Sequence, residues 1–156
     1  MYNECESIKK GDHIMADILV VYWTGTGNTE IMAEKVREGI EKAGKTVDLR
    51  TVDAVDPSEV EGFEKVVFGC PSMGVEVLEE DEFEPFFEEA EQLISGKKVA
   101  LFGSYGWGDG EWMDIWQERV LEKGAQLFEK GLIVNTTPSS EEEEDCIAFG
   151  ERFASY

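Results

Sequence analysis

The sequence has few basic residues and a single histidine. Among its 156 residues, 14 lysines and arginines face 35 aspartates and glutamates, which gives a formal net charge of -21 at pH 7. Such a surface repels nucleic acid and anionic membranes and attracts basic proteins. The one histidine, His13, lies in a segment without hydrophobic periodicity. Histidine-based triads and most histidine metal sites are therefore excluded.

Cysteine pairs and long apolar runs are missing as well. Cys5, Cys70 and Cys146 are widely spaced, with no CxxC pair to indicate a disulfide framework, a zinc site or a thioredoxin-type motif. No run approaches the ~20 apolar residues of a transmembrane helix. The N-terminus has neither the apolar core nor the cleavage site of a signal peptide. These absences predict a cytoplasmic protein with no membrane partner.

The length and composition suit one domain. A hydrophobic content of 42% is ample for one well-packed core in a chain of this size. Residues 1–16 have no hydrophobic period and are expected to form a loose N-terminal leader, so the folded domain covers residues 17–156. No exposed apolar stripe is left over after the helices are assigned, which predicts a monomer.

Strand patterns alternate with helix patterns along the chain. Apolar, β-branched runs predict buried strands, and apolar residues recurring at three and four predict helices. The expected strands are 17–23, 46–52, 65–70, 98–103 and 131–134, and the expected helices are 28–42, 82–94, 112–122 and 142–154. This alternation implies a parallel sheet covered on both faces. We predict a doubly wound α/β fold with five parallel strands in the order 2-1-3-4-5 and a ligand beyond their carboxyl ends.

Three loops follow the first, third and fourth expected strands, so they share one edge of the sheet. The first loop is Thr24, Gly25, Thr26, Gly27, Asn28 and Thr29. It precedes a helix N-terminus, where free backbone N–H groups and the helix dipole favour an anion. Neither a Walker ending nor a GxGxxG fingerprint is present. A single terminal phosphate bound without lysine or arginine fits best, and an ordinary helix cap is the alternative.

The second and third loops offer cover for a flat aromatic ligand. They consist of Pro71, Ser72, Met73, Gly74, Val75 and Glu76, and of Ser104, Tyr105, Gly106, Trp107, Gly108, Asp109 and Gly110. The Met73 thioether and the Trp107 indole can cover the two faces of a ring, with glycines that allow close backbone approach. Either side chain could instead belong to the core, although the turn sequence GWGDG is poorly suited to burying an indole without a partner.

Together with CPSMGVEVLEEDEFEPF and SGKKVALFGSYGWGDGEWM, these loops resemble a short-chain flavodoxin of the clostridial type over residues 17–155. The resemblance implies a flavodoxin-like fold and a non-covalently bound FMN. It also implies a low-potential single-electron carrier that works between the semiquinone and hydroquinone states and turns over no substrate of its own.

The resemblance also implies roles for the loop residues. Residues 24–29 would hold the FMN phosphate, and Met73 and Trp107 would flank the isoalloxazine ring. Gly74 and Glu76 would meet its N5 and N3 side, and residues 104–108 would lie along its other edge.

Two residues depart from the family pattern. Pro71 stands where a hydroxyl residue would help to bind the ribityl chain, which predicts the loss of about one hydrogen bond, ~1 kcal/mol. Val75 stands where an acidic or small polar residue usually follows the glycine. A type II′ turn requires positive φ only at Gly74, so the valine is tolerated and a peptide flip toward N5 on reduction is expected to persist.

An acidic segment begins in the second loop. No basic residue lies between Lys65 and Lys97, and the acids there are Glu76, Glu79, Glu80, Asp81, Glu82, Glu84, Glu88, Glu89 and Glu91. Negative charge near the flavin should lower the potential of its second reduction. The same face is expected to dock basic-surfaced redox proteins, such as reductases and oxidoreductases, at rates that fall as salt rises. A solvated helix face is the alternative reading of these charges.

Two other functions are compatible with this fold. One is a flavodoxin-like FMN oxidoreductase acting on a small acceptor such as a quinone. Two features of the sequence argue against this enzyme: it has no recognisable nicotinamide site, and it has no acid–base pair beyond surface carboxylates. The other is a flavin-free response-regulator module. That module needs aspartates at the ends of the first and third strands, where Tyr22-Trp23-Thr24 and Gly69-Cys70-Pro71 stand instead.

Overall fold

The computed structural model describes residues 16–156. The rest of the expected leader, with Cys5 and His13, lies outside the described residues, and Ala16 packs against the edge of the core. The strands are β1 (Ile18–Tyr22), β2 (Val47–Thr51), β3 (Lys65–Gly69), β4 (Lys98–Tyr105), β5 (Gln126–Leu127) and β6 (Leu132–Asn135). The helices are α1 (Asn28–Lys42), α2 (Phe83–Ala90), α3 (Glu111–Glu122) and α4 (Ser140–Ala154), with short 3₁₀ turns η2 (Val52–Ala54), η3 (Pro57–Gly62) and η4 (Glu91–Leu93).

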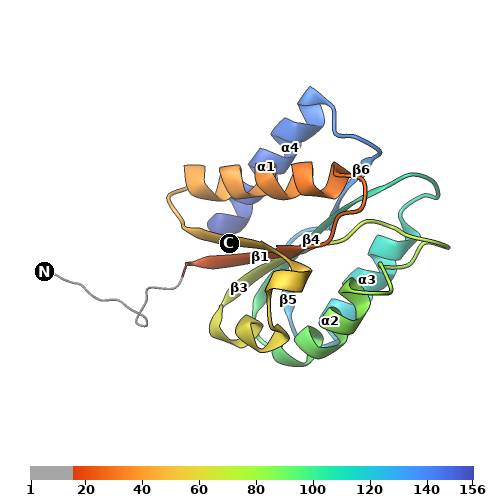
Figure 1. The fold of residues 1–156 in the computed structure, drawn as a ribbon. Helices are drawn as coiled ribbons and strands as arrows, with labels where there is room; N and C mark the ends of the chain where they lie inside the picture. The colour runs from red at the N-terminus through yellow and green to blue at the C-terminus, as the bar shows by residue number, and fades with distance from the viewer. Residues whose placement is uncertain (1–15) are drawn as a thin grey trace, which may run out of the picture.

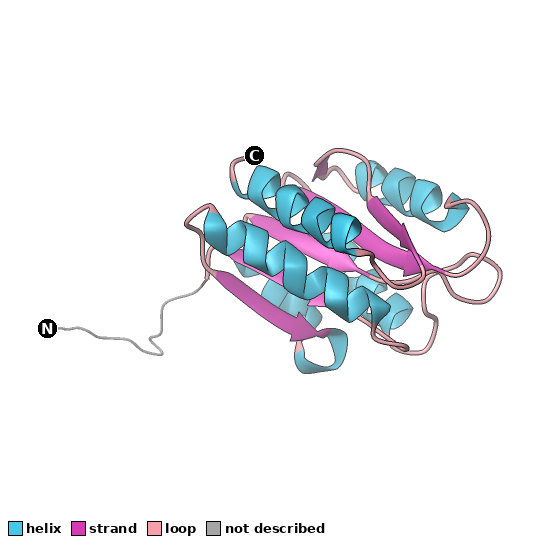
Figure 2. Cartoon of the chain, turned by 90° about the horizontal axis from the view of Figure 1, so that it is seen from above, coloured by secondary structure: helices cyan, strands magenta, loops and turns pink. Residues whose placement is uncertain are grey.

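A parallel sheet forms the middle of three layers (Figures 1 and 2). Its strands run in the order β2-β1-β3-β4-β5, which confirms the predicted flavodoxin-like topology. Helices α1 and α4 cover one face, and α2 and α3 cover the other. Right-handed crossovers between parallel strands require this arrangement.

The sheet edge next to β4 differs from the prediction. One strand was expected there, near 131–134, but two short strands share the edge of β4. β5 pairs with Lys98 and Val99, and β6 pairs with the stretch from Phe102 to Tyr105. Because β6 supplies these later partners, β4 extends to Tyr105 rather than ending at Gly103.

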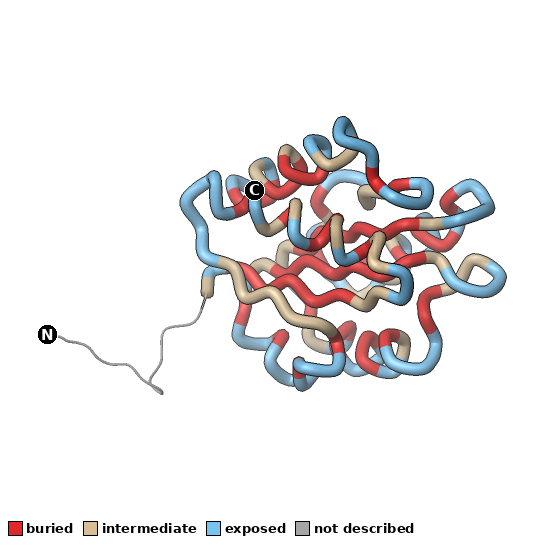
Figure 3. Tube along the Cα trace, turned by 45° about the horizontal axis from the view of Figure 1, so that its top comes forward, coloured by how far each residue is buried: buried red, intermediate tan, exposed pale blue. Residues whose placement is uncertain are grey.

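The core consists of two clusters, one on each face of the sheet. Alternate residues of β1 belong to different clusters, with Leu19 and Val21 on the α2–α3 side and Ile18, Val20 and Tyr22 on the α1–α4 side. This alternation follows from the two-residue period of a strand. The central strands β1, β3 and β4 are therefore buried on both sides, as Figure 3 shows for the middle of the sheet.

Helices α1 and α4 pack closely through two glycines. A Cβ atom added at Gly150 would collide with the carbonyl oxygen of Val36, and one added at Gly39 would collide with the carbonyl oxygen of Ile147. Protein interiors are packed so densely that adding a single methyl group changes the stability of the fold. The two helices can approach this far only because neither contact position carries a side chain.

Long-range contacts hold the C-terminal end of α4 at the amino edge of the sheet. The Lys65 ammonium donates to the carbonyl oxygens of Phe153 and Ala154, at 3.3 and 2.9 Å. Lys98 donates to the carbonyl oxygen of Tyr156 at 2.7 Å. Cations suit the negative end of a helix dipole. Because Lys65 and Lys98 begin β3 and β4, the last residues lie at the edge opposite the loops that follow the strands.

Within residues 16–156, no helix has the length and apolar character needed to cross a membrane.

Candidate functional site

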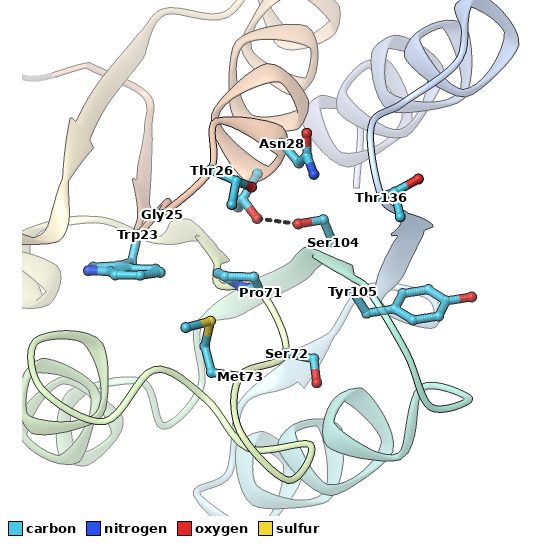
Figure 4. A pocket seen from close by; sticks show the side chains of 12 residues that line it. Trp23, Gly25, Thr26, Asn28, Pro71, Ser72, Met73, Ser104, Tyr105 and Thr136 are labelled. Atoms are coloured by element: carbon cyan, nitrogen blue, oxygen red, sulfur yellow. Dashed lines mark hydrogen bonds between the residues drawn. The ribbon is translucent and has the colours of Figure 1, made fainter.

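The three predicted loops meet around one cavity at the carboxyl edge of the sheet (Figure 4). The cavity has a volume of about 210 Å³. It is lined by Trp23, Gly25, Thr26, Asn28, Thr29, Pro71, Ser72, Met73, Ser104, Tyr105, Gly106 and Thr136. Most of these residues were singled out in the sequence. The remaining predicted residues lie on the same loops without lining the cavity: Thr24, Gly27, Gly74, Val75, Glu76, Trp107 and Gly108.

The first loop presents the N-terminus of α1 to the cavity. Gly27 has φ 99° at the N-cap position, a left-handed conformation that glycine adopts without strain. Its N–H donates to Thr24 Oγ1 at 3.1 Å, which closes the loop. In the described chain, no side chain caps the first turn of α1, and Asn28 and Thr29 of that turn line the cavity. The backbone N–H groups of this turn are therefore suited to an anion.

The floor of the cavity is fixed by hydroxyl groups. Thr29 Oγ1 and Ser104 Oγ lie 2.9 Å apart in a buried hydrogen bond that joins α1 to β4. Beneath the loop, the Tyr22 hydroxyl donates to Glu30 Oε2 at 3.2 Å. Burial, and then the nearby Glu30 carboxylate, raise the pKa of Tyr22 to about 12. Tyr22 therefore stays neutral at ordinary pH and adds no charge under the site.

The second loop is a tight turn closed by backbone hydrogen bonds. The Met73 N–H donates to the Val77 carbonyl at 2.7 Å, and the Val77 N–H donates back to the Met73 carbonyl at 2.9 Å. Gly74 has the positive φ that was expected of it, 51°, but the loop between the paired residues Met73 and Val77 holds three residues rather than the two of a type II′ turn, and Val75 at its tip is 79% exposed. Glu76 also has a positive φ, 53°, which the sequence did not indicate. The shape of this loop is therefore set by its own backbone hydrogen bonds.

The third loop carries an exposed indole. Trp107 is 61% exposed, so the alternative that it is a core residue is wrong. Met73 on the second loop is 38% exposed. The Ser72 N–H donates to the Ser104 carbonyl at 3.0 Å and joins the second loop to the end of β4. Large apolar side chains held at a surface in this way are available to cover an aromatic ligand.

Sequence reasoning missed two lining residues, Trp23 and Thr136. Trp23 reads as the last residue of a buried strand, yet its indole N–H donates to Glu82 Oε1 at 2.8 Å and its ring lies against Gly25. Thr136 follows β6, with φ 58° and its N–H bonded to the Tyr105 carbonyl at 2.8 Å. The one available signal was the position of Thr136 after the last strand, because loops that follow parallel strands share this edge.

The donor set fits FMN. Backbone N–H groups at α1 suit the phosphate, hydroxyl groups suit the ribityl chain, and the exposed thioether and indole suit the ring. No lysine or arginine lines the cavity. Among residues 16–156, no cluster of histidine, cysteine, aspartate or glutamate is arranged to hold a metal ion. Burial raises the pKa of the Cys70 thiol, which keeps it protonated and unreactive beneath the second loop.

Comparisons with known proteins agree with this geometry. A family model described as Flavodoxin matches residues 20–150. Flavodoxin of Clostridium beijerinckii is 53% identical over 86% of this chain and 97% of the relative, and that of Megasphaera elsdenii is 42% identical over 86% and 96%.

Solved structures show the same similarity. The two-electron reduced M. elsdenii flavodoxin in solution superposes with a TM-score of 0.82 at 41% identity, covering 89% of this chain and 99% of the other. Oxidised flavodoxin 1 of Bacillus cereus gives a TM-score of 0.81 at 28% identity, covering 89% of this chain and 97% of the other. With the family model matching most of its length and relatives matching almost end to end, the chain belongs to the flavodoxins, the FMN-containing low-potential electron carriers.

Proposed function

We propose that this chain holds one FMN non-covalently in the cavity at the carboxyl edge of the sheet and passes single electrons between larger redox proteins. One observation carries the assignment of this site. The uncapped N-terminus of α1 opens into a cavity that has no lysine or arginine in its lining and is bordered by the exposed Met73. A phosphate bound by dipoles and a ring covered by apolar side chains need this combination.

Each loop then has its own task. The first turn of α1 holds the phosphate, and the Thr29–Ser104 pair keeps the cavity floor at a fixed depth. Met73 and Trp107 cover the two faces of the ring and exclude water from them. The positive φ at Gly74 leaves the Gly74–Val75 peptide able to turn its carbonyl toward the ring edge. FMN, when bound, supplies the one-electron chemistry.

The chain is a carrier and not an enzyme. No described histidine or reactive thiol lies at the cavity, and the buried Cys70 and Cys146 have raised pKa values. Membership of the flavodoxins supports this assignment. An exposed ring edge is enough for electron transfer to a docked partner.

The partners are basic-surfaced reductases and oxidoreductases. Exposed carboxylates lie in or directly after the second and third loops, among them Glu80, Asp81, Glu82, Asp109 and Glu111. Charge of one sign around a site speeds encounter with a surface of the other sign, and salt screens it over ~8–10 Å. The protein works as a monomer in the cytoplasm. Association rates that ignore ionic strength would contradict this choice of partner.

The decisive experiment is an anaerobic dithionite titration of the purified protein, followed by visible absorption. A yellow protein that develops a long-wavelength band at half reduction, and then bleaches, would establish bound FMN and one-electron transfer together. A Gly74→Ala variant should show a weaker band, because the added methyl group disfavours the positive φ. A colourless protein that does not take up FMN would overturn the proposal, and so would oxidation of NAD(P)H by the protein alone.

A further inference from the structure

We propose that the Glu76 carboxylate is a clasp that holds the loop of Met73 against the loop of Trp107. It is a positioning residue, distinct from any contact with flavin N3 that the resemblance implies. The inference deepens the proposed function and rests on it, because Met73 and Trp107 are the side chains that cover the ring. What Glu76 sets is the separation of their two loops.

The first observation is a hydrogen bond between the loops. Glu76 Oε1 accepts the backbone N–H of Glu111 at 2.9 Å, across 35 residues of sequence. Glu111 is the first residue of α3, and the N-cap residue Gly110 has no side chain with which to cap the helix. A carboxylate at this end satisfies a free N–H and interacts favourably with the helix dipole. Glu76 therefore caps α3 from another loop, as Ser139 caps α4 from the adjacent position.

The second observation is the contact between Glu76 and Gly108. A Cβ atom built at Gly108 would stand 2.5 Å from Glu76 Cδ and 2.6 Å from Oε2, closer than a carbon can approach. Gly108 has φ 85°, so both its conformation and its missing side chain suit this contact. Since Gly108 follows Trp107 directly, the carboxylate lies against the backbone that carries the indole.

The third observation is the backbone of Glu76 itself. Its φ of 53° is left-handed, a conformation that L-residues other than asparagine and aspartate adopt rarely. The paired hydrogen bonds of Met73 and Val77 enclose this residue and maintain the conformation. Unusual backbone held by its surroundings is a common feature of functional sites. Here it belongs to the residue whose side chain reaches α3.

Neighbouring acids give a contrast that identifies Glu76. Glu79 is buried and accepts the N–H groups of Asp81, Glu82 and Phe83 at the start of α2, so it stays within its own segment. Glu80 is exposed and makes no hydrogen bond to the third loop. Of these three acids, only Glu76 joins the two loops that flank the ring. Glu80 is thus a matched control of the same charge.

The test is amide hydrogen exchange at Glu111, measured by NMR on the full chain with and without FMN. Glu76→Ala should speed exchange of the Glu111 amide about five-fold or more, the size expected when a helix cap is lost. It should also speed FMN dissociation. Glu76→Gln keeps an acceptor of the same reach and should fall between Glu76→Ala and the parent. Glu80→Ala should leave the Glu111 amide unchanged.

A second variant approaches the clasp from the other side. Gly108→Ala places a methyl group where the carboxylate lies and should also speed exchange at Glu111. In the Glu76→Ala background the same change should add less, because the carboxylate is already gone. Thermal unfolding of each variant shows whether the whole fold has been lost instead.

Two results would overturn the clasp: an unchanged Glu111 amide in Glu76→Ala, or equal acceleration by Glu80→Ala. Additive effects of Glu76→Ala and Gly108→Ala would count against it as well. These results do not depend on the flavin. If the parent protein failed to bind FMN, the proposed function would fail, while exchange at Glu111 would still decide whether Glu76 joins the loops.

Discussion

The hydroxyl groups of Thr29 and Ser104 lie 2.9 Å apart in the cavity floor, although 75 residues separate them in the sequence. Both side chains are buried, with 1% and 5% exposure. A buried polar group that loses its partner costs more than the bond itself contributes. This pair therefore stabilises the fold and fixes the depth of the cavity at the same time.

Ser104→Ala should lower the free energy of unfolding by ~1–2 kcal/mol, because it leaves the Thr29 hydroxyl without its partner. Urea unfolding of the FMN-free protein measures the change. The double variant Thr29→Val with Ser104→Ala should cost less than the sum of the two single changes. Strict additivity would show that the two hydroxyl groups do not depend on each other.

Gly150→Ala should destabilise the protein by ~1–3 kcal/mol, because the new methyl group collides with the Val36 carbonyl of α1. Helix propensity alone predicts the opposite change, because alanine is favoured over glycine by ~1 kcal/mol inside an unhindered helix. A loss of stability would therefore indicate the collision. Urea unfolding measures the difference. Glu144→Ala, at an exposed position of the same helix, should stay within ~0.5 kcal/mol of the parent. A Gly150→Ala protein as stable as the parent would refute the close packing of α1 and α4.

Stability should fall in alkali partly through Tyr22. Burial raises the pKa of Tyr22 from 10.0 to about 12, so between these values the unfolded chain releases a proton that the folded chain keeps. The stability that Tyr22 contributes by keeping its proton is fully present below pH 10. It is lost as the pH rises toward 12, at up to ~1.4 kcal/mol per pH unit. Burial raises the pKa of Cys146 to about 12 as well, which acts in the same direction.

Tyr22→Phe should therefore make the decline of stability between pH 10 and 12 shallower, while leaving the slope near pH 7 unchanged. Urea midpoints measured across this range provide the test. An equal alkaline slope in the variant and the parent would show that Tyr22 does not cause the decline.

Pro71→Ser should tighten FMN binding about five-fold, which corresponds to one hydrogen bond of ~1 kcal/mol. Pro71 lines the cavity beside Ser72, and a hydroxyl there would face the ribityl chain. Flavin fluorescence titration measures the dissociation constant. Riboflavin should gain as much as FMN, because both carry the ribityl chain. A gain restricted to FMN would assign the effect to the phosphate instead.

Local patterns predicted most of the fold. Residues 28–42 were expected to be helical and form α1 with those bounds, because its apolar period and flanking glycines are encoded locally. The edge beside β4 was harder to predict. Whether one strand or two complete it depends on pairing with residues about 30 positions earlier, and strand propensity depends on such context.

In the site, too, local patterns predicted some residues, whereas others depend on contacts between distant segments. Turn residues identified ten of the twelve lining residues, because each loop follows a recognisable strand. Trp23 and Thr136 were missed since nothing in their own neighbourhood distinguishes them from a strand end and a polar loop. The φ of Glu76 and its reach to Glu111 depend on two loops that approach each other only in the folded chain.

The bond from Lys98 to the Tyr156 carbonyl has a practical consequence. It keeps the last residue at the edge of the sheet opposite the cavity. A linker attached after Tyr156 would thus fix the protein to an electrode, or to a fused reductase, with its redox face pointing outward. The attachment point would then be far from the cavity. An electron would therefore reach the cavity either from a carrier in solution or by crossing the full length of the strands.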